Sequence, residues 1–183
     1  MSGPERRVEE WTLLGERPRT DGWLPVTTRT YRMPDGSISQ WDIHTIPFTT
    51  VAVLALTDHG DVVATRQFRP GPGQVVVDLP GGIVDPGEDV LGAAVRELRE
   101  ETGYSCRAVE PAGQAWAFGA STWRRHVVIA RGVQPEGEVT SWGGDEYCEP
   151  VLLSVAELRA VARTGRTTDT DLIYLALDAA GLL

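Results

Sequence analysis

Three glutamates stand at a spacing that could support chemistry. Glu97, Glu100 and Glu101 lie near the end of Asp89–Thr102, a segment whose apolar residues recur at the helical period. Residues three and four apart are neighbours on a helix, so these carboxylates can converge on one side. Like charges at this spacing cost roughly a few tenths of a kcal/mol per pair, and anions at a helix C-terminus oppose its macrodipole by roughly 0.3–1 kcal/mol each. The cluster therefore needs a partner that offsets its charge.

Two kinds of partner fit this pattern. A divalent cation would offset the charge, and a carboxylate set with no cysteine or histidine nearby selects the hard ions Mg²⁺ or Mn²⁺ over zinc. The alternative is a solvated polar face on which Arg96 and Arg99 neutralise the glutamates. The three glutamates alone leave both interpretations open.

The residues before the helix favour a cation site. Gly81 and Gly82 allow the backbone to come close to a ligand, and Pro86-Gly87 predicts a tight turn that lays a loop beside the helix start. We expect Glu88 in the first turn of the helix, where an anion is favourable. Loop carbonyls at one end and carboxylates at the other are typical of a metal site.

With these flanks the stretch resembles the Nudix box. The pattern of that box is Gly, five residues, Glu, seven residues, Arg-Glu-hydrophobic, one residue, Glu-Glu, one residue, Gly-hydrophobic. Every fixed position is filled without a gap, by Gly82, Glu88, Arg96, Glu97, Leu98, Glu100, Glu101, Gly103 and Tyr104. A match at nine positions within 23 residues is highly specific.

The resemblance implies a fold, a cofactor and residue roles. The family fold is an α/β/α sandwich with a mixed sheet, and the cofactor is Mg²⁺, which Mn²⁺ can replace. The metal ligands implied are three carboxylates and one backbone carbonyl, those of Glu97, Glu100, Glu101 and Gly81. Arg96 and Glu88 would orient these ligands and so belong with Glu100 to the catalytic set.

Outside the box the chain resembles the ADP-ribose pyrophosphatase-like branch of this family. Four segments carry the resemblance: Met33–Gly36, Arg66–Arg69, Asp78–Gly82 and Asp145–Glu149. In that branch the N-terminal strands exchange across a dimer and help to form the substrate pocket. The resemblance therefore implies a homodimer.

Three places depart from the pattern of that branch. Relatives that prefer ADP-ribose carry a Pro-Gly element after the box, where this chain has Ala117–Ala120 without proline. The Ser-Glu-Arg that often follows is replaced by Ser121–Arg124, and the strand that offers basic residues across the dimer reads Gln40–Asp42. We therefore expect a pocket whose selectivity differs from that of a dedicated ADP-ribose enzyme.

Four side chains are candidates for substrate binding. Trp116 and Trp123 flank the altered loop, where either can stack on a nucleobase or pack in a core or an interface. Arg66 and Arg69 are separated by three residues on a predicted strand, so they need a bulge or a turn to share one face.

The implied reaction is attack of water on a phosphorus of a nucleoside diphosphate derivative, such as ADP-ribose or a nucleotide sugar. The protein and its substrate are both negatively charged, which makes Mg²⁺ essential. The general base would be Glu146 or one of the box glutamates. The alternative is a Nudix-fold binding or regulatory protein without catalysis, which the intact glutamate set disfavours. An isomerase of prenyl diphosphates would need a catalytic cysteine, and neither Cys106 nor Cys148 has the setting for one.

Strands dominate the elements that must position these residues. We expect an N-terminal antiparallel meander over residues 11–46, with a turn at Pro34–Gly36. Further strands are predicted at Val51–Thr57, Val62–Phe68, Gln74–Leu79, Ser105–Val109, Gln114–Phe118, Arg125–Ala130 and Pro150–Leu153. This order favours an α+β layered fold.

Helices are few and interspersed among the strands. The helix that carries the glutamates should stop at Gly103. A capping box of Ser154 and Glu157 predicts a second helix to about Ala162, and a third should run from Thr168–Asp169 to Gly181. We divide the chain into an N-terminal meander, 1–46, for dimerisation and the substrate pocket, and a catalytic domain, 47–183.

Composition restricts the classes of partner. The 183 residues favour one domain with a small appendage, and 42% hydrophobic residues are enough for a packed core. The net charge of −9 opposes binding to duplex nucleic acid. Two distant cysteines without metal spacing fit a reducing compartment, and we expect neither a signal peptide nor a membrane span. These features predict a cytoplasmic protein with a small-molecule substrate.

Overall fold

The structure, a computed structural model, describes residues 12–19, 24–143 and 146–183. The chain forms two compact units, one of residues 1–47 with 116–123 and one of residues 48–115 with 124–183. The second unit contains every residue of the glutamate motif. Trp11 and Asp145, which the sequence places in the first strand and in an acidic segment, lie outside the described residues.

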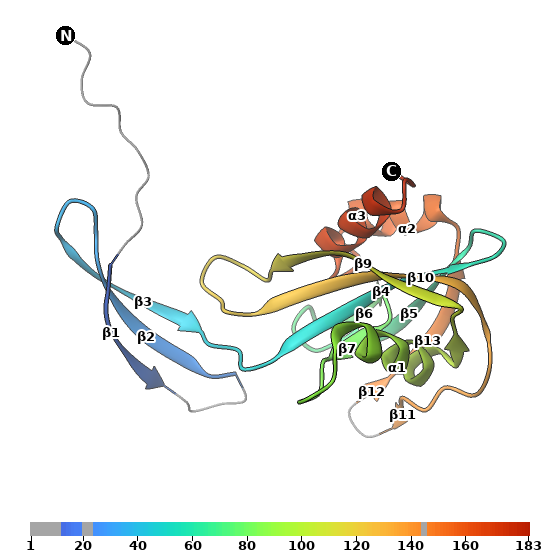
Figure 1. Ribbon diagram of the computed structural model, residues 1–183, viewed down its shortest axis with the longest axis horizontal. Helices are drawn as coiled ribbons and strands as arrows, with labels where there is room; N and C mark the ends of the chain where they lie inside the picture. The colour runs from blue at the N-terminus through green and yellow to red at the C-terminus, as the bar shows by residue number, and fades with distance from the viewer. Residues whose placement is uncertain (1–11, 20–23, 144–145) are drawn as a thin grey trace, which may run out of the picture. The chain divides into compact units, whose positions relative to one another are not determined.

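The first unit contains an antiparallel sheet in the order β1-β2-β3 (Figure 1). Its strands are β1 (Thr12–Arg19), β2 (Val26–Arg32) and β3 (Ile38–His44). The turn between β2 and β3 is closed by a hydrogen bond from the Gly36 amide to the Met33 carbonyl at 2.9 Å. The expected meander is confirmed, and the loop 116–123 joins it through a bond from the His44 amide to the Ala120 carbonyl at 2.9 Å.

The second unit is built on a mixed sheet with the order β13-β5-β4-β10-β8, to which β6, β7 and β9 add by pairing with β5, β4 and β10. Only the central pair, β4 with β10, is parallel among the pairs whose register the structure describes. The strands are β4 (Thr49–Thr57), β5 (Val62–Arg69), β6 (Gln74–Asp78), β7 (Gly81–Ile83), β8 (Tyr104–Ser105), β9 (Ala108–Trp116), β10 (Arg124–Pro135) and β13 (Glu149–Leu153). A short pair, β11 (Trp142–Gly143) with β12 (Glu146–Tyr147), precedes β13.

Helices cover both faces of this sheet (Figure 1). Helix α1 (Val90–Thr102) packs on one face, and helices α2 (Val155–Thr164) and α3 (Thr170–Ala179) pack on the other. Strand β4 contributes to the core on both faces of the sheet. Ala52, Leu54 and Leu56 pack under α2 and α3. The alternate residues Val51, Val53 and Ala55 pack under α1. A strand covered on both faces is apolar throughout. The expected α/β/α sandwich is confirmed.

Helix α1 has the predicted length and stop. Asp89 is the N-cap, with its side chain accepting a hydrogen bond from the Gly92 amide at 2.6 Å, and Gly103 ends the helix with φ of 73°. One expectation was wrong, because Glu88 precedes the N-cap and does not lie in the first turn. Asp89 takes the cap position since its shorter side chain reaches the free amides.

Two other predicted elements can be compared with the structure. The capping box of α2 is confirmed, with the Glu157 amide donating to Ser154 Oγ at 3.2 Å and the Ser154 amide donating to the Glu157 carboxylate at 2.7 Å. The strands expected at Ser105–Val109 and Gln114–Phe118 were wrong in their bounds, because β9 runs unbroken through Pro111. Strand β9 pairs with β10 alone among the described strands, and an edge strand tolerates a proline.

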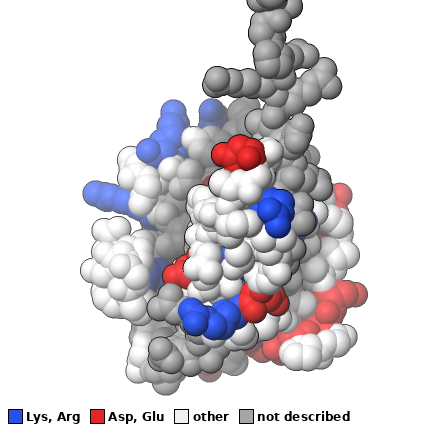
Figure 2. All heavy atoms as spheres, turned by 90° about the vertical axis from the view of Figure 1, so that its left-hand side faces the viewer, with Lys and Arg blue, Asp and Glu red and all other residues white. Residues whose placement is uncertain are grey.

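Acidic and basic side chains both occur on the face shown in Figure 2, so the excess of acidic residues does not give that face a single sign. Within the described ranges, no helix has the length and apolar character required to cross a membrane.

The stop of α1 makes a testable prediction. Gly103 and Gly165 end α1 and α2 with nearly the same backbone, φ of 73° and 66°, but a Cβ on Gly103 would lie 2.5 Å from the Gly137 carbonyl oxygen whereas one on Gly165 meets no atom. We expect Gly165→Ala to cost roughly 1–2 kcal/mol of unfolding free energy in urea. Gly103→Ala should cost about 1–3 kcal/mol more, because the Cβ also overpacks the site. Equal losses would show that the contact with Gly137 has no energetic weight.

Candidate active site

Strand β7 and helix α1 bring the two halves of the glutamate motif together. Gly81 and Gly82 pair with Ala52 and Val51 of β4, which places β7 beside α1 within the second unit. A Cβ on Gly82 would collide with the carboxylate of Glu97, whose side chain is 13% exposed. Glycine is therefore required here for Glu97 to lie against the backbone of β7.

Glu101 is a buried carboxylate at the end of α1. It is 4% exposed and accepts hydrogen bonds from the Gly81 amide at 2.8 Å and from the Cys148 thiol at 3.3 Å. Burial raises the pKa of Glu101 to about 7, although both hydrogen bonds act to lower it. This side chain thus ties α1 to β7 and to the segment before β13 while it carries an unfavourable buried charge.

Arg96 gathers the remaining acidic groups. Its Nη1 donates to Glu97 at 2.8 Å and to Glu100 at 3.3 Å, and its Nη2 donates to Glu88 at 3.0 Å and to the carbonyl of Ile83 at 2.9 Å. These hydrogen bonds hold the pKa of Glu88 below its usual range and raise the pKa of Arg96. The loop before the helix is therefore fixed to the helix through one guanidinium.

Arg99 does not share this role. Its side chain is 69% exposed, and its nearest ion partner in the part of the chain that the structure describes is Glu136 at 3.9 Å. Of the two arginines that the sequence offered as neutralising partners, only Arg96 contacts the glutamates. Arg96 thus neutralises Glu97 and Glu100. The buried Glu101 accepts from two uncharged donors, and the nearby charge of Arg69 also acts to lower its pKa.

The atoms that could bind a metal ion at this site are all oxygens. Glu97, Glu100 and Glu101 supply carboxylates, and Gly81 supplies a carbonyl on the adjacent strand. Within the described residues no three acidic, histidine or cysteine side chains already stand close enough to hold an ion. Arg96 bridges Glu97 and Glu100 instead. The chemistry of the set fits a hard divalent cation, because oxygen ligands suit Mg²⁺ and Mn²⁺.

The structure does not bring Arg66 and Arg69 together. Strand β5 pairs with β6 without a bulge, so residues three apart point to opposite faces. Arg66 is exposed and lies 3.6 Å from Glu149, whereas Arg69 forms a 2.9 Å ion pair with the buried Asp78. Arg69 therefore belongs to a buried polar network around Asp78, and its side chain does not lie beside that of Arg66.

That network was not foreseen from the sequence. The carboxylate of Asp78 accepts from the Thr167 hydroxyl at 2.9 Å and the Thr168 amide at 2.7 Å, which joins the end of β6 to the segment before α3. Asp169 accepts from the Leu79 amide at 3.3 Å and from Arg125 Nη2 at 2.7 Å. Burial and the charge of Asp78 raise the pKa of Asp169 to about 6. Partners 90 residues apart leave no local signal in the sequence.

The other predicted site residues lie in three places. Trp116 ends β9 and is 52% exposed, and Trp123 is half-buried at the other end of the loop. The two flank the loop as expected, with the Ala117 amide donating to the Trp123 carbonyl at 3.1 Å. Glu146 has its backbone in β12, and its side chain lies outside the described part of the structure.

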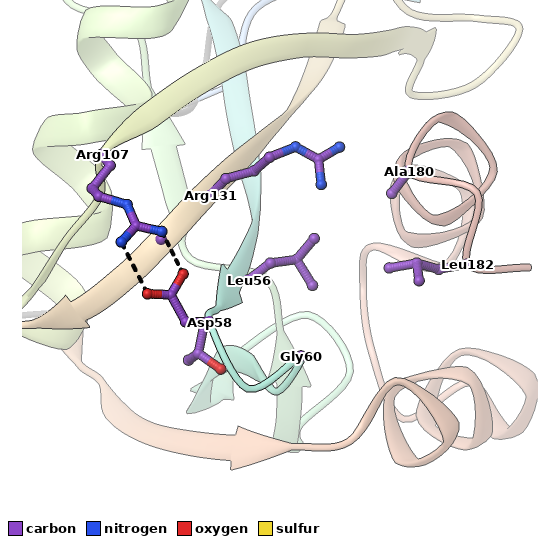
Figure 3. Close-up of a pocket in the computed structure, with 9 residues that line it drawn as sticks. Leu56, Asp58, Gly60, Arg107, Arg131, Ala180 and Leu182 are labelled. Carbon is purple, nitrogen blue, oxygen red and sulfur yellow. Dashed lines mark hydrogen bonds and ion pairs between the residues drawn. The ribbon is translucent and has the colours of Figure 1, made fainter.

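A cavity of about 390 Å³ lies at the other end of β4 (Figure 3). Leu56, Leu182 and Arg131 line it, together with Arg107 and Asp58, which form an ion pair. Among the described residues none of the predicted site side chains borders this cavity. The carboxylates of α1 therefore form a separate site, near the paired residues Ala52 and Gly81.

The second unit is a mixed sheet between helices, and the glutamates at the end of α1 lie beside the two glycines of β7. A comparison with models of known protein families matches the NUDIX domain over residues 47–174. The match covers more than half of the chain, so the protein belongs to the Nudix family, as the motif indicated. It is a Nudix hydrolase, and its full set of box glutamates is in place.

Individual relatives support the same assignment. The methanol dehydrogenase activator of Bacillus methanolicus is 28% identical over 182 residues, covering 94% of this chain and 95% of the relative. The ADP-ribose pyrophosphatase of Bacillus subtilis (strain 168) is 26% identical over 170 residues, covering 92% and 91%. A crystal structure of an ADP compounds hydrolase has a TM-score of 0.79 at 17% identity, covering 98% of this chain and 100% of that chain, which confirms the fold. The chain is thus similar to the ADP-ribose pyrophosphatase of Bacillus subtilis along most of its length.

The burial of Glu101 makes a testable prediction about the protein in a chelating buffer. A glutamate whose pKa is raised from 4.5 to about 7 by folding contributes stability at low pH that is lost as the pH rises through 7, a change of about 3 kcal/mol. We expect Glu101→Gln to raise the unfolding free energy at pH 8 by roughly 1–3 kcal/mol and to leave it nearly unchanged at pH 4.

Urea unfolding at both pH values measures this difference. Glu136→Gln is the matched control, because Glu136 is exposed and should give no gain at either pH. A loss of stability at pH 8 in Glu101→Gln would contradict the account of Glu101 as a costly buried charge.

Proposed function

We propose that this Nudix hydrolase cleaves the diphosphate linkage of a nucleoside diphosphate derivative, such as ADP-ribose or a nucleotide sugar, with Mg²⁺ as cofactor. The observation that carries the proposal is the buried Glu101 carboxylate at the Gly81 amide, beside the Glu97 and Glu100 carboxylates that Arg96 gathers. An ADP-sugar pyrophosphatase of Mus musculus, 34% identical over 100 residues, supports the substrate class; the match covers 48% of this chain and 45% of that protein.

In this proposal Glu97, Glu100, Glu101 and the Gly81 carbonyl hold the cation. When bound, the cation screens the diphosphate, lowers the pKa of the attacking water and stabilises the leaving phosphate. Arg96 and Glu88 orient the carboxylates through the bonds that already join them. Mn²⁺ should replace Mg²⁺, because both prefer oxygen donors.

A carboxylate must take the proton of the attacking water. We propose Glu146 for this role, or one of the box glutamates. Glu146 lies in β12, two residues before Cys148, and the Cys148 thiol donates to Glu101. This connection supports a position for Glu146 on the side of α1 where Glu101 lies. The binding or regulatory alternative is not favoured, since all three box glutamates are retained.

The motif contains nothing that reads a base or a sugar, so recognition must come from elsewhere. We propose that the loop 116–123, with Trp116 and Trp123, and the N-terminal strands read the group beyond the diphosphate. Support comes from the first unit itself, which joins that loop to β3 through His44. Arg66 and Arg69 can serve only separately, because they face opposite sides of β5. We place the enzyme in the cytoplasm, where its two free cysteines stay reduced.

The experiment that tests this function is a comparison of catalytic efficiencies. With Mg²⁺ present, we expect hydrolysis of ADP-ribose or a nucleotide sugar to exceed that of nucleoside triphosphates and dinucleoside polyphosphates, and a chelator to abolish it. Glu101→Gln should lower turnover by several orders of magnitude, because a cation ligand is lost. Glu136→Gln, an exposed control on the segment after β10, should retain turnover. A clear preference for triphosphates, or full activity in chelator, would refute the proposal.

We further propose that the enzyme is a homodimer formed through its N-terminal strands. The three-stranded sheet exposes large apolar side chains, with Ile38 at 53% and Trp41 at 44% exposure, and such edges and faces favour a partner surface. Sedimentation at micromolar concentration should show twice the chain mass, and Trp41→Arg should shift the protein toward monomer. The exposed Tyr147→Arg, in the second unit, is the control. A fully active monomer would exclude this arrangement.

A further inference from the structure

Asp169 stands at the N-cap of α3 but does not cap the helix. An aspartate at this position ordinarily accepts a hydrogen bond from an amide of the first turn, and here the side chain makes none. Its carboxylate instead accepts from the Leu79 amide at 3.3 Å and from Arg125 Nη2 at 2.7 Å. The helix forgoes a cap, and the carboxylate reaches a segment 90 residues earlier in the chain.

The Leu79 amide needs this acceptor. Leu79 is 1% exposed and lies in the gap between β6, which ends at Asp78, and β7, which begins at Gly81. A buried amide without a partner is costly, and neither strand supplies one at Leu79. The next two residues are fixed by the Val53 amide, which donates to the Pro80 carbonyl at 2.8 Å, and by Glu101, which accepts from the Gly81 amide at 2.8 Å.

Arg125 holds the Asp169 carboxylate in place. Arg125 is 12% exposed and donates to Asp169 and also to Asp171, which is 44% exposed. The other charges near Asp169 are Asp78, fully buried, and Arg69, which pairs with Asp78 at 2.9 Å. Three negative and two positive charges thus form a connected set next to Leu79, and a satisfied, largely buried network of this kind rigidifies its surroundings.

We propose that Asp169 is a positioning residue that sets the carbonyl of Gly81 for cation binding. The Asp169 carboxylate holds the Leu79 amide, and the Val53 amide holds the Pro80 carbonyl. Gly81 therefore begins β7 with its amide bound to Glu101 and with the direction of its carbonyl set by the backbone before it. Without the Asp169 anchor, the segment Leu79–Gly81 loses its first fixed point. The inference rests on the proposed function, since the Gly81 carbonyl matters to the reaction only as a cation ligand.

Amide hydrogen exchange of the chelated full-length protein tests the anchor without any need for activity. In Asp169→Ala we expect the Gly81 amide to exchange at least tenfold faster relative to Val128, a fully buried reference in β10. Asp171→Ala also removes a partner of Arg125 but does not touch Leu79, so it should change this ratio less than twofold. If the alanine variant does not fold, Asp169→Leu carries the same test, because leucine has nearly the size of aspartate and offers the Leu79 amide no acceptor.

A second readout connects the anchor to the cation. The Mg²⁺ concentration for half-maximal hydrolysis should rise at least fivefold in Asp169→Ala, with kcat at saturating Mg²⁺ within a few-fold of the parent, and it should not change in Asp171→Ala. An unchanged Gly81 exchange ratio, or an unchanged Mg²⁺ requirement in an active variant, would overturn the proposal. If the parent enzyme hydrolyses none of the substrates, the proposed function fails, whereas the exchange ratio still decides whether Asp169 anchors Gly81.

Discussion

The burial of one carboxylate, that of Glu101, constrains the rest of the second unit. A charge removed from water needs hydrogen-bond donors, and Glu101 takes the Gly81 amide, 20 residues before it, and the Cys148 thiol, 47 residues after it. Helix α1 must therefore end beside β7 and beside the segment leading into β13. The stop at Gly103 and the absence of a side chain at Gly82 both serve this arrangement.

The two interpretations of the glutamates offered by the sequence each describe part of the site. Arg96 does neutralise Glu97 and Glu100, but it also binds Glu88 and the Ile83 carbonyl, so it organises a loop as well as a charge. Charge balance on a solvated face requires contacts with carboxylates alone, so the bond from Arg96 to the Ile83 carbonyl indicates a second, structural role. Arg99, by contrast, is exposed and only balances the charge of Glu136 at the surface.

The local sequence pattern predicted those structural features that depend on residues close together in the chain. The helical period, Gly103 and the Ser154 capping box gave α1 and α2 closely, and the spacing of the glutamates placed Glu97 and Glu100 on one guanidinium. The pattern did not predict contacts between distant segments. Asp169 was expected only to open a helix, yet its carboxylate binds Leu79, and Cys148 had no evident role, yet its thiol donates to Glu101. Glu88 was expected in the first turn of α1, but Asp89 is the N-cap and Glu88 precedes it.

We propose that the carboxylates of α1 bind one class of ligand, a hard divalent cation. Electron paramagnetic resonance of Mn²⁺ added to the chelated and dialysed protein measures this directly, because bound Mn²⁺ loses the sharp signal of the free ion. We predict a saturable loss of the signal in the parent protein and a much weaker loss in Glu97→Gln, with Arg99→Gln behaving as the parent. A free-ion signal that stays undiminished in excess protein would contradict it.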